Sequence, residues 1–398
     1  MKRLVWALSL FLMTAFANAA EINFMDNPAW NTVLEKAKKE NKMIFLDGYA
    51  TWCGPCKTMD AETYKNQAVA DYFNANFINV KYDMEKGEGP KLAEQYQVTA
   101  YPSLLFINAN GNILHKGVGF HEAADFVTLG QTAKNPETQF FTLKNKAMEL
   151  SNAQFVKFAA MAAEFEDEDF TQISNDYLAK QADILGNADL IDLVMNHIET
   201  LPDEKSLAYI IANKDKIVKG GKYTAQDVEE RMIGLTLGYA VSGAIQGDSE
   251  EPDFAAVKTV LDKYIPEKSF FIYHFFQTQY FLNSKKTDDA IKEFNILLDN
   301  TPAKVDFEHL CNAMMTFGPV LAEEGKLAPM LTKFESIVLP AKDAKKAYLK
   351  DYVKAILFIK AKDFEKFKAL ANSMIANPDT PDAIKEDLKS ALAQIGKM

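Results

Sequence analysis

The pattern of apolar residues changes once along the sequence, near Lys134-Asn135-Pro136, and this change limits the folds that the chain can adopt. Before that point, short apolar runs typical of buried strands alternate with amphipathic stretches typical of helices. After it, residues 142–398 consist of helical stretches separated by polar, glycine or proline breaks. The chain of 398 residues is also too long for one ordinary domain. We therefore expect an α/β domain followed by an all-α region.

The elements expected in the first part of the chain form a mixed layer. Strands are expected over residues 43–49, 77–82, 103–107 and 113–116. Helices are expected over residues 27–40, 55–66, 91–96 and 121–131. Asn110-Gly111 predicts a tight hairpin between the last two strands. Helices that alternate with strands imply a sheet covered on both faces.

The first nineteen residues have the features of a secretory signal peptide. Lys2 and Arg3 precede an apolar run from Leu4 to Phe16, and Ala17-Asn18-Ala19 offers the small-x-small pattern of a cleavage site. The apolar run is shorter than the roughly 20 residues that span a bilayer, and no later segment is long and apolar enough. We expect an exported chain that is cleaved after about Ala19, is not embedded in the membrane and is located in a bacterial periplasm.

These features divide the chain into four segments. They are a signal peptide (1–19), an α/β domain (20–134), a linker (135–141) and an all-helical domain (142–398). In the last segment, Pro302, Pro340 and Pro378 are each 38 residues apart. An apolar set precedes each proline: Ile291/Phe294/Leu298, Leu331/Phe334/Val338 and Phe367/Leu370/Met374. A period near 38 residues is typical of tetratricopeptide-like helix pairs, and an irregular helical bundle is the alternative.

Composition excludes some classes of partner. The chain has 44 basic and 55 acidic residues and a net charge of −11, without a basic block. Such a chain has little to replace the counterions of a nucleic acid, so no nucleic-acid partner is expected. The run of seven aromatic residues within Ser269–Phe281 fits either a binding groove or core packing between helices.

The strongest chemical signal is Trp52-Cys53-Gly54-Pro55-Cys56. Two cysteines separated by two residues can close a small disulfide ring, and a thiol at a helix start is stabilised as the thiolate. We expect Cys53, at the helix entry, to be the exposed nucleophile, and Cys56, one turn inside, to be the resolving thiol. A structural disulfide is the alternative, although a ring of four residues removes little chain entropy.

A metal site is a weaker interpretation of the same motif. Zinc would need a second pair of ligands, whereas the third cysteine, Cys311, stands alone and the five histidines lack ligand spacing. No metal is therefore expected. Cys311 itself is expected to be buried and inert, with a disulfide-linked dimer as the minority alternative.

The stretch from Asp47 to Lys57 (DGYATWCGPCK) resembles the active site of the thioredoxin family, and the resemblance covers about Glu21 to Lys134. It implies a thioredoxin fold. It further implies that Asp47 is a buried carboxylate that exchanges a proton with the resolving thiol. Lys81 matches the family's lysine beside that acid. The substrate-binding residues that the resemblance implies are Trp52, Gly54, Pro55, Tyr101 and a cis Pro102.

The resemblance also extends to a subfamily. The extra residues 85–90 and the stretch from Met59 to Phe77 are similar to the thioredoxin-like domain of periplasmic reductases related to the transmembrane electron carrier DsbD. This similarity implies an exported thiol-disulfide oxidoreductase with protein disulfides as substrates.

The direction of electron flow is expected to be reductive. Gly54 and Pro55 are the pair of reducing thioredoxins, and the histidine of oxidising relatives is absent between the cysteines. No cofactor is expected, because the sequence has no nicotinamide or flavin motif, so a membrane thiol protein would supply the electrons. A disulfide isomerase or oxidase is one alternative. The other is a protein-binding scaffold in which the thioredoxin-like domain mainly positions clients.

Overall fold

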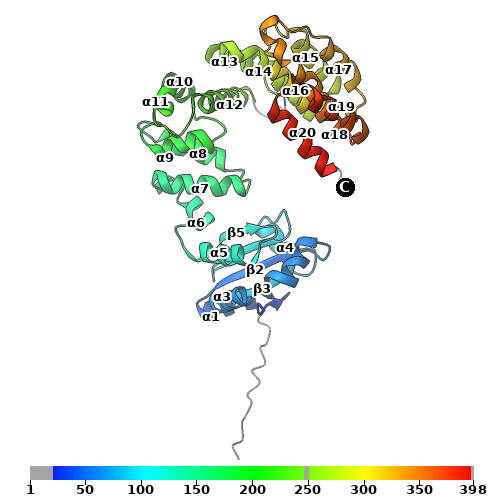
Figure 1. Cartoon of the computed structure of the whole chain (residues 1–398). Coiled ribbons are helices and arrows are strands. Elements are labelled where there is room, and N and C mark those ends of the chain that lie inside the picture. Colours follow the sequence, from blue (N-terminus) through cyan, green and yellow to red (C-terminus); the bar gives the residue numbers. More distant parts are fainter. Residues whose placement is uncertain (1–20, 246–250, 396–398) are drawn as a thin grey trace, which may run out of the picture. The chain divides into compact units, whose positions relative to one another are not determined.

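The computed structural model describes residues 21–245 and 251–395 (Figure 1). The predicted signal peptide lies outside the described residues, so export stays a prediction. Within the described ranges, no helix is long and apolar enough to cross a membrane. The chain divides into two compact units, residues 1–198 and residues 199–398.

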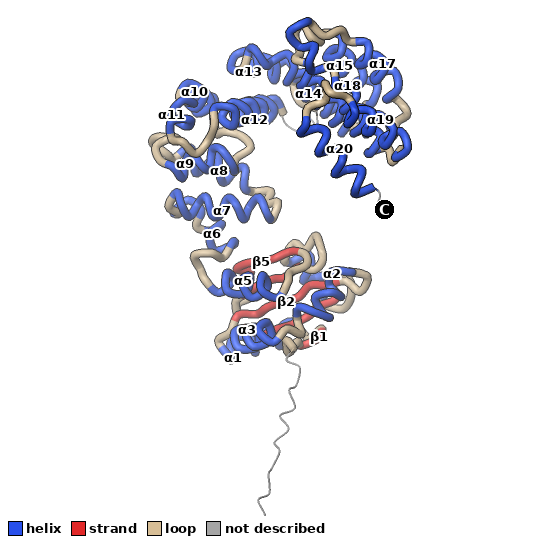
Figure 2. Tube along the Cα trace, in the orientation of Figure 1, coloured by secondary structure: helices blue, strands red, loops and turns tan. Residues whose placement is uncertain are grey.

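The first unit contains a five-stranded sheet with the order β1-β3-β2-β4-β5 (Figure 2). The strands are β1 (Met25–Asp26), β2 (Met43–Tyr49), β3 (Phe77–Asp83), β4 (Ser103–Ile107) and β5 (Ile113–Val118). Strands β1 and β2 run parallel to β3, whereas β4 is antiparallel to both β2 and β5. The four predicted strands and the hairpin are confirmed, and the two-residue β1 has no counterpart among the predictions.

The helices of this sheet domain differ from the predictions at one place. They are α1 (Trp30–Glu40), α2 (Gly54–Thr58), α3 (Gln67–Asn76), α4 (Gly89–Gln95) and α5 (Ala123–Lys134). The single helix expected over residues 55–66 is present only as far as Thr63, because α2 passes into a π-helical turn, Met59–Thr63, and the helical segment ends there. The Asn66 side chain then accepts hydrogen bonds from the backbone N–H groups of Ala68 and Val69, which starts α3, a helix that the sequence analysis missed.

The sheet is covered on both faces, as the alternation of helices and strands predicts. Successive residues of β2 point to opposite faces. Ile44 and Leu46 therefore pack into one apolar cluster with residues of α1 and α4, and Phe45 packs into another with residues of α3 and α5. In the second cluster the rings of Phe73 and Phe126 stack with their centroids 4.2 Å apart. The β2 strand is thus rigidly held just before the cysteine motif.

Helices continue in the first unit after the sheet domain. They are α6 (Phe140–Asn145), a 3-10 turn (Ala147–Glu149), α7 (Asn152–Glu164), α8 (Phe170–Ala179) and α9 (Ala188–Asn196). The start of α6 is attached to β5, because the Phe140 N–H donates to Nδ1 of the buried His115 at 3.2 Å. The predicted linker therefore already includes the first residues of a packed helix, and the domain boundaries at 134 and 142 stay a prediction.

The described part of the second unit contains helices and no strands, and the all-α prediction is confirmed. Its helices are α10 (Glu204–Ala212), α11 (Lys214–Lys219), α12 (Ala225–Ala244), α13 (Phe254–Tyr264), α14 (Pro266–Asn283), α15 (Thr287–Asp299), α16 (Phe307–Glu323), α17 (Leu327–Ser336), a 3-10 segment (Ala341–Lys346), α18 (Tyr348–Lys360), α19 (Phe364–Ala376) and α20 (Asp382–Ile395). Two of the three apolar repeat sets lie on helices α15 and α19. The third set breaks the repeat, because Val338 follows the end of α17 and is 83% exposed. The tetratricopeptide-like repeat stays a prediction.

The aromatic run of residues 269–281 forms α14 and packs inside the second unit. Phe270, Phe271 and Phe275 contact one apolar cluster, whereas Tyr273 and Phe276 contact another. These rings are only partly buried by this packing, so a binding groove stays the alternative interpretation. Cys311 on α16 is a free and buried cysteine, as expected. Burial raises the pKa of its thiol to about 12, so it stays protonated and unreactive at neutral pH.

Candidate active site

The two cysteines lie where strand β2 gives way to helix α2. Cys53 occupies the N-cap position of α2, and its Sγ accepts a hydrogen bond from the backbone N–H of Cys56 at 3.1 Å. Pro55 stands in the first turn of the helix, where its missing N–H costs nothing. Cys53 and Cys56 are joined in a disulfide. The predicted helix entry therefore places the first sulfur at the positive end of a short helix.

The exposure expected for Cys53 is wrong for this oxidised form. Cys53 is 2% exposed and Cys56 is 4% exposed, so neither cysteine is the open one. The physical reason is that Tyr49 and Tyr101 pack against the cluster formed by Ala50 and the two cysteines. In this oxidised form both cysteines are thus screened from solvent by their neighbours.

Trp52 forms the exposed rim of the site. Its side chain is 67% exposed, and Gly54 and Pro55 beside it are exposed as well. The indole Nε1–H donates to the carboxylate of Glu85 at 2.8 Å, and the indole ring meets the ring of Tyr101 edge to face at 5.8 Å. Trp52 is therefore held from two sides although most of it faces solvent.

The Tyr101–Pro102 peptide bond is cis, in agreement with the resemblance. The Pro102 carbonyl accepts a hydrogen bond from the N–H of Gly119 at 2.9 Å, which ties this loop to the end of β5. Gly119 has φ +82°, a left-handed conformation that suits glycine. The structure thus brings Tyr101 and Pro102 to the same place as the cysteines, across 45 or more residues of sequence.

Asp47 and Lys81 face each other from neighbouring strands. They are register partners on β2 and β3, and the Lys81 Nζ lies 3.5 Å from Oδ2 of Asp47. Burial raises the pKa of the Asp47 carboxyl to about 6, although the charge of Lys81 opposes this shift. An acid with a pKa near neutrality can both accept and release a proton at physiological pH. The structure therefore pairs Asp47 with Lys81, and proton exchange between Asp47 and the resolving thiol stays a prediction.

Sequence reasoning missed a second carboxylate at this ion pair. Asp60, in the π-helical turn, also pairs with Lys81, and its side chain is 47% exposed. Burial lowers the pKa of Lys81, but the two carboxylates outweigh it, so the net shift is upward. Tyr64 is another missed neighbour: its buried hydroxyl lies beside the Asp47 carboxyl and favours the ionised form of that acid, which lowers the pKa of Asp47 against the larger effect of burial. The only signal was that both residues lie in the stretch from Met59 to Phe77, which resembles the subfamily.

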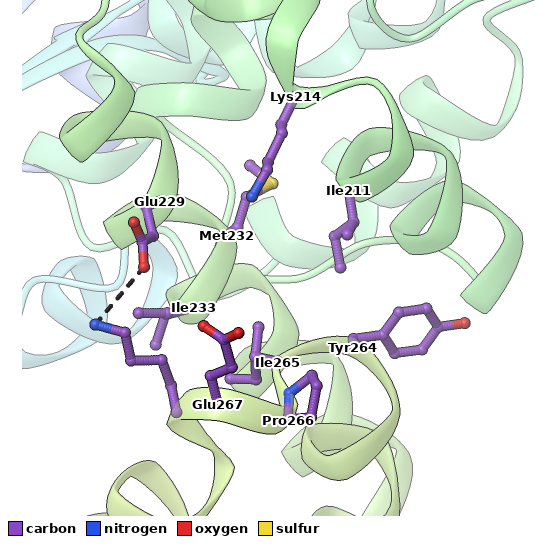
Figure 3. Close-up of a pocket in the computed structure, with 10 residues that line it drawn as sticks. Ile211, Lys214, Glu229, Met232, Ile233, Tyr264, Ile265, Pro266 and Glu267 are labelled. Carbon is purple, nitrogen blue, oxygen red and sulfur yellow. Dashed lines mark ion pairs between the residues drawn. The ribbon is translucent and has the colours of Figure 1, made fainter. Parts of the chain in front are cut away.

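A cavity of about 300 Å³ lies in the second unit and is lined by residues from α10 to α14 (Figure 3). Its floor is apolar, with Ile211, Met232 and Ile265 among the lining residues. Charged groups stand at its rim, where Lys268 pairs with Glu229 at 3.6 Å. The residues that line the cavity include no cysteine, so it has no group for disulfide exchange.

The comparisons with known proteins identify thioredoxin-like relatives of this chain. The family model Thioredox_DsbH, "Protein of unknown function, DUF255", matches residues 1–107. Thioredoxin of Echinococcus granulosus is 39% identical over 94 residues, which are 23% of this chain and 78% of that protein. Thioredoxin-1 of Drosophila melanogaster is 37% identical over 71 residues, 18% of this chain, and the chain spans 62% of its length.

Two further matches concern bacterial proteins of disulfide chemistry. The thiol:disulfide interchange protein DsbD of Colwellia psychrerythraea is 31% identical over 98 residues, 23% of this chain but only 16% of DsbD. The solution structure of a proposed disulphide-isomerase from Bacteroides thetaiotaomicron is 41% identical, covers 30% of this chain and 98% of that chain, and has a TM-score of 0.28. These relatives and the solved structure match between 18% and 30% of this chain.

Proposed function

The chain belongs to the thioredoxin family of thiol-disulfide oxidoreductases, and from this premise we propose that it is an exported reductase of protein disulfides. The observation that carries the proposal is the Cys53–Cys56 disulfide at the start of α2, close to the Tyr101–Pro102 loop. In the proposal, Trp52, Gly54, Pro55, Tyr101 and Pro102 bind the substrate polypeptide around the sulfur atoms.

The proposed reaction starts from the reduced dithiol. The Cys53 thiolate attacks one sulfur of a substrate disulfide, forms a mixed disulfide and expels a substrate thiolate, which takes up a proton. Cys56 then loses its proton to the Asp47 carboxylate and attacks Cys53. The second substrate thiol leaves and the Cys53–Cys56 disulfide forms. Two electrons pass from the chain to the substrate, and a thiol protein must return two electrons before the next cycle.

Lys81 has a supporting role in this scheme. Its ammonium group stands 3.5 Å from Asp47 and also pairs with Asp60. A positive charge at this place favours the ionised carboxylate, while burial favours the neutral acid. The balance of the two effects leaves the pKa of Asp47 at about 6, which suits a group that takes a proton and later returns it.

Export and the reducing direction rest on the sequence. Residues 1–19 have the pattern of a signal peptide, which supports a periplasmic location. Gly54 and Pro55 lack the histidine that makes a disulfide more oxidising. Since no nicotinamide or flavin motif is present in the sequence, a membrane thiol protein is the proposed electron donor.

The reduction potential of the cysteine pair tests this proposal first. Trp30 and Trp52 are the tryptophans outside the predicted signal peptide, and both lie in the sheet domain. Their fluorescence in graded thiol and disulfide buffers therefore reports on this couple. A potential near about −270 mV, as in thioredoxin, supports a reductase. A value near about −120 mV would reject it in favour of an oxidase or isomerase.

A second role, client binding by the helical region, is supported by the cavity of Figure 3 with its apolar floor and charged rim. It is compatible with redox chemistry and also with a pure scaffold. Trapping experiments separate the two, because a Cys56→Ala chain keeps a substrate covalently bound to Cys53 only if exchange takes place. Clients that stay bound to a chain lacking both Cys53 and Cys56 are held by the scaffold alone.

A further inference from the structure

A large polar pocket lies in the first unit, between the sheet domain and the helices that follow it. Its volume is about 770 Å³, which is ample for a polypeptide side chain and its neighbours. The lining residues come from α4 and the loop after it, from β5, from α6 and from the turn between α7 and α8. They include Glu94, Thr99, Lys116, Lys144 and the acidic residues 166–169. We call this cavity the acidic pocket.

Charge distinguishes the acidic pocket from an ordinary surface hollow. Five carboxylates and two lysines line it, so its net charge is −3. Lys144 is engaged by Asp167 at 2.6 Å and by Asp169 at 2.7 Å. Lys116 lies over the ring of Phe165, 5.0 Å from its centroid. Both lysines are thus used to hold the turn between α7 and α8 in place.

The remaining carboxylates of the pocket are exposed and have no positively charged partner among the described residues. Glu94, Glu166 and Glu168 are exposed, and none of them has an ion pair within the described ranges of the chain. A hollow with one excess sign of charge concentrates field and attracts the opposite charge. The pocket therefore favours a cationic group over a neutral or anionic one.

Asp167 adds an observation of a different kind. Its side chain is only 9% exposed, and one oxygen, Oδ2, pairs with Lys144. The other oxygen, Oδ1, is buried and has no hydrogen-bond partner among the described residues. A buried carboxylate oxygen without a donor is unfavourable, so an N–H donor that enters the pocket would satisfy it.

The chain itself connects the acidic pocket to the disulfide. Thr99 lines the pocket, and Tyr101, two residues later, packs against Cys53 and Cys56. Two residues span at most about 7 Å. A polypeptide that lies along the Tyr101–Pro102 loop can therefore place a side chain in the pocket while its cystine faces Cys53.

We propose that the acidic pocket binds a lysine or arginine side chain of the polypeptide whose disulfide reacts at Cys53 and Cys56; this rests on the proposed function. A metal ion is a poorer occupant, because the described residues contain no group of three or more side chains arranged to hold one. A guanidinium or ammonium group instead supplies several N–H donors, for Asp167 and for the exposed glutamates. The pocket would select substrates with a basic residue near the cystine.

The test measures binding apart from redox chemistry. The full chain with Cys53→Ala and Cys56→Ala is titrated at low salt with a labelled peptide that carries lysines beside a cystine, and with the same peptide carrying glutamines instead. In this background, Glu166→Gln/Glu168→Gln removes two exposed charges of the pocket. We expect the Kd of the lysine peptide to rise about fivefold, and that of the glutamine peptide to stay unchanged.

The matched control is Glu35→Gln/Glu137→Gln, which removes two exposed carboxylates of the same unit that do not line the pocket. Equal Kd values for the lysine peptide in the pocket variant and in the control variant would overturn the inference. Exchange activity of the wild-type cysteines on the same peptides is measured in parallel. If the chain prefers the lysine peptide but exchanges no disulfide, the pocket stands and the proposed function fails.

Discussion

Cys53 and Cys311 are both almost completely buried, but the residues around them differ. In the sheet domain, the cysteine motif is next to aromatic rings, and the strand before it holds the connected set Asp47, Lys81 and Asp60. In the helical unit, Cys311 is surrounded by an apolar cluster. Burial alone therefore does not make a thiol reactive, since the neighbouring dipoles and charges decide its protonation.

The comparison extends to how the two regions are built. The sheet domain assembles its site from β2, α2, the Tyr101–Pro102 loop and the residues after β3, which are distant in sequence. The described part of the second unit is built from consecutive helices that pack on their neighbours. The candidate active site, which needs several groups at one point, thus lies in the region where segments distant in sequence pack together.

Replacing single cysteines should give the largest difference between the two regions. We expect Cys53→Ser to reduce the rate of protein-disulfide reduction, with dithiothreitol as the electron source, by at least about a thousandfold, because the attacking thiolate is lost. Cys311→Ser should leave this rate unchanged. A comparable loss of rate for the Cys311 variant would show that the contrast between the two thiols is false.

Asp47 should make the sheet domain less stable at neutral pH. Its folded pKa of about 6 is above the ordinary value of 3.8, so its contribution to stability is complete below pH 3.8 and is lost as the pH rises through 6. We expect Asp47→Asn to increase the free energy of unfolding at pH 7 by about 3 kcal/mol and to have no such effect at pH 3.5. Denaturant unfolding followed by tryptophan fluorescence measures both values.

The same substitution should slow the release of substrate. In the proposed reaction the Asp47 carboxylate takes the proton of Cys56, so its loss should make the mixed disulfide with Cys53 persist longer. Lys81→Met serves as the control that removes the charge but keeps the acid.

For the stability prediction, a lower free energy of unfolding for Asp47→Asn at pH 7 would be incompatible with a buried, partly protonated carboxyl.

His115 should give the attachment of α6 a pH dependence. Burial lowers the pKa of His115 to about 4, and the neutral ring accepts a hydrogen bond from the Phe140 N–H. The unfolded chain takes up this proton at about pH 6.5, so stability falls as the pH decreases from 6.5 towards 4. We expect His115 to account for a loss of about 2 kcal/mol at pH 5.

The variant His115→Asn isolates this effect. Its side-chain oxygen can accept from Phe140 near the position of Nδ1, but it cannot be protonated in this range. The difference in unfolding free energy between the two proteins, measured from pH 7 to pH 5, should change by the stated amount. If the free energy of unfolding changed equally with pH in both proteins, His115 would not be the group that causes the loss of stability.

The smallest effect is expected from the size of the Cys311 side chain. Cys311→Ala removes one buried sulfur from the apolar cluster of α16, and we expect a loss of about 1 kcal/mol in the stability of the second unit. Circular dichroism follows this helical unit, whereas tryptophan fluorescence follows the sheet domain. A change in the fluorescence transition alone would show that the substitution affects the sheet domain, which contradicts the prediction.

The periodicity of apolar residues predicted most of the elements. Strands β2 and β4 have the predicted bounds, because a short apolar run that is buried on both faces has sharp ends. Helix α3 was missed, because it follows α2 and the π-helical turn without a glycine or proline break. The break is made by the Asn66 cap, which a pattern of apolar residues does not register.

The amino-acid sequence alone was sufficient for the fold class, the cysteine pair and its place at a helix start. These features depend on the spacing of residues that are close together in the sequence. Only the tertiary structure joined Asp60 to Lys81, 21 residues away, and Glu85 to Trp52, 33 residues away. Only the tertiary structure also brought together the segments that line the acidic pocket, which are α4, β5, α6 and the turn after α7. Contacts between distant segments depend on how strands and helices pack, and no periodicity along the chain encodes that packing.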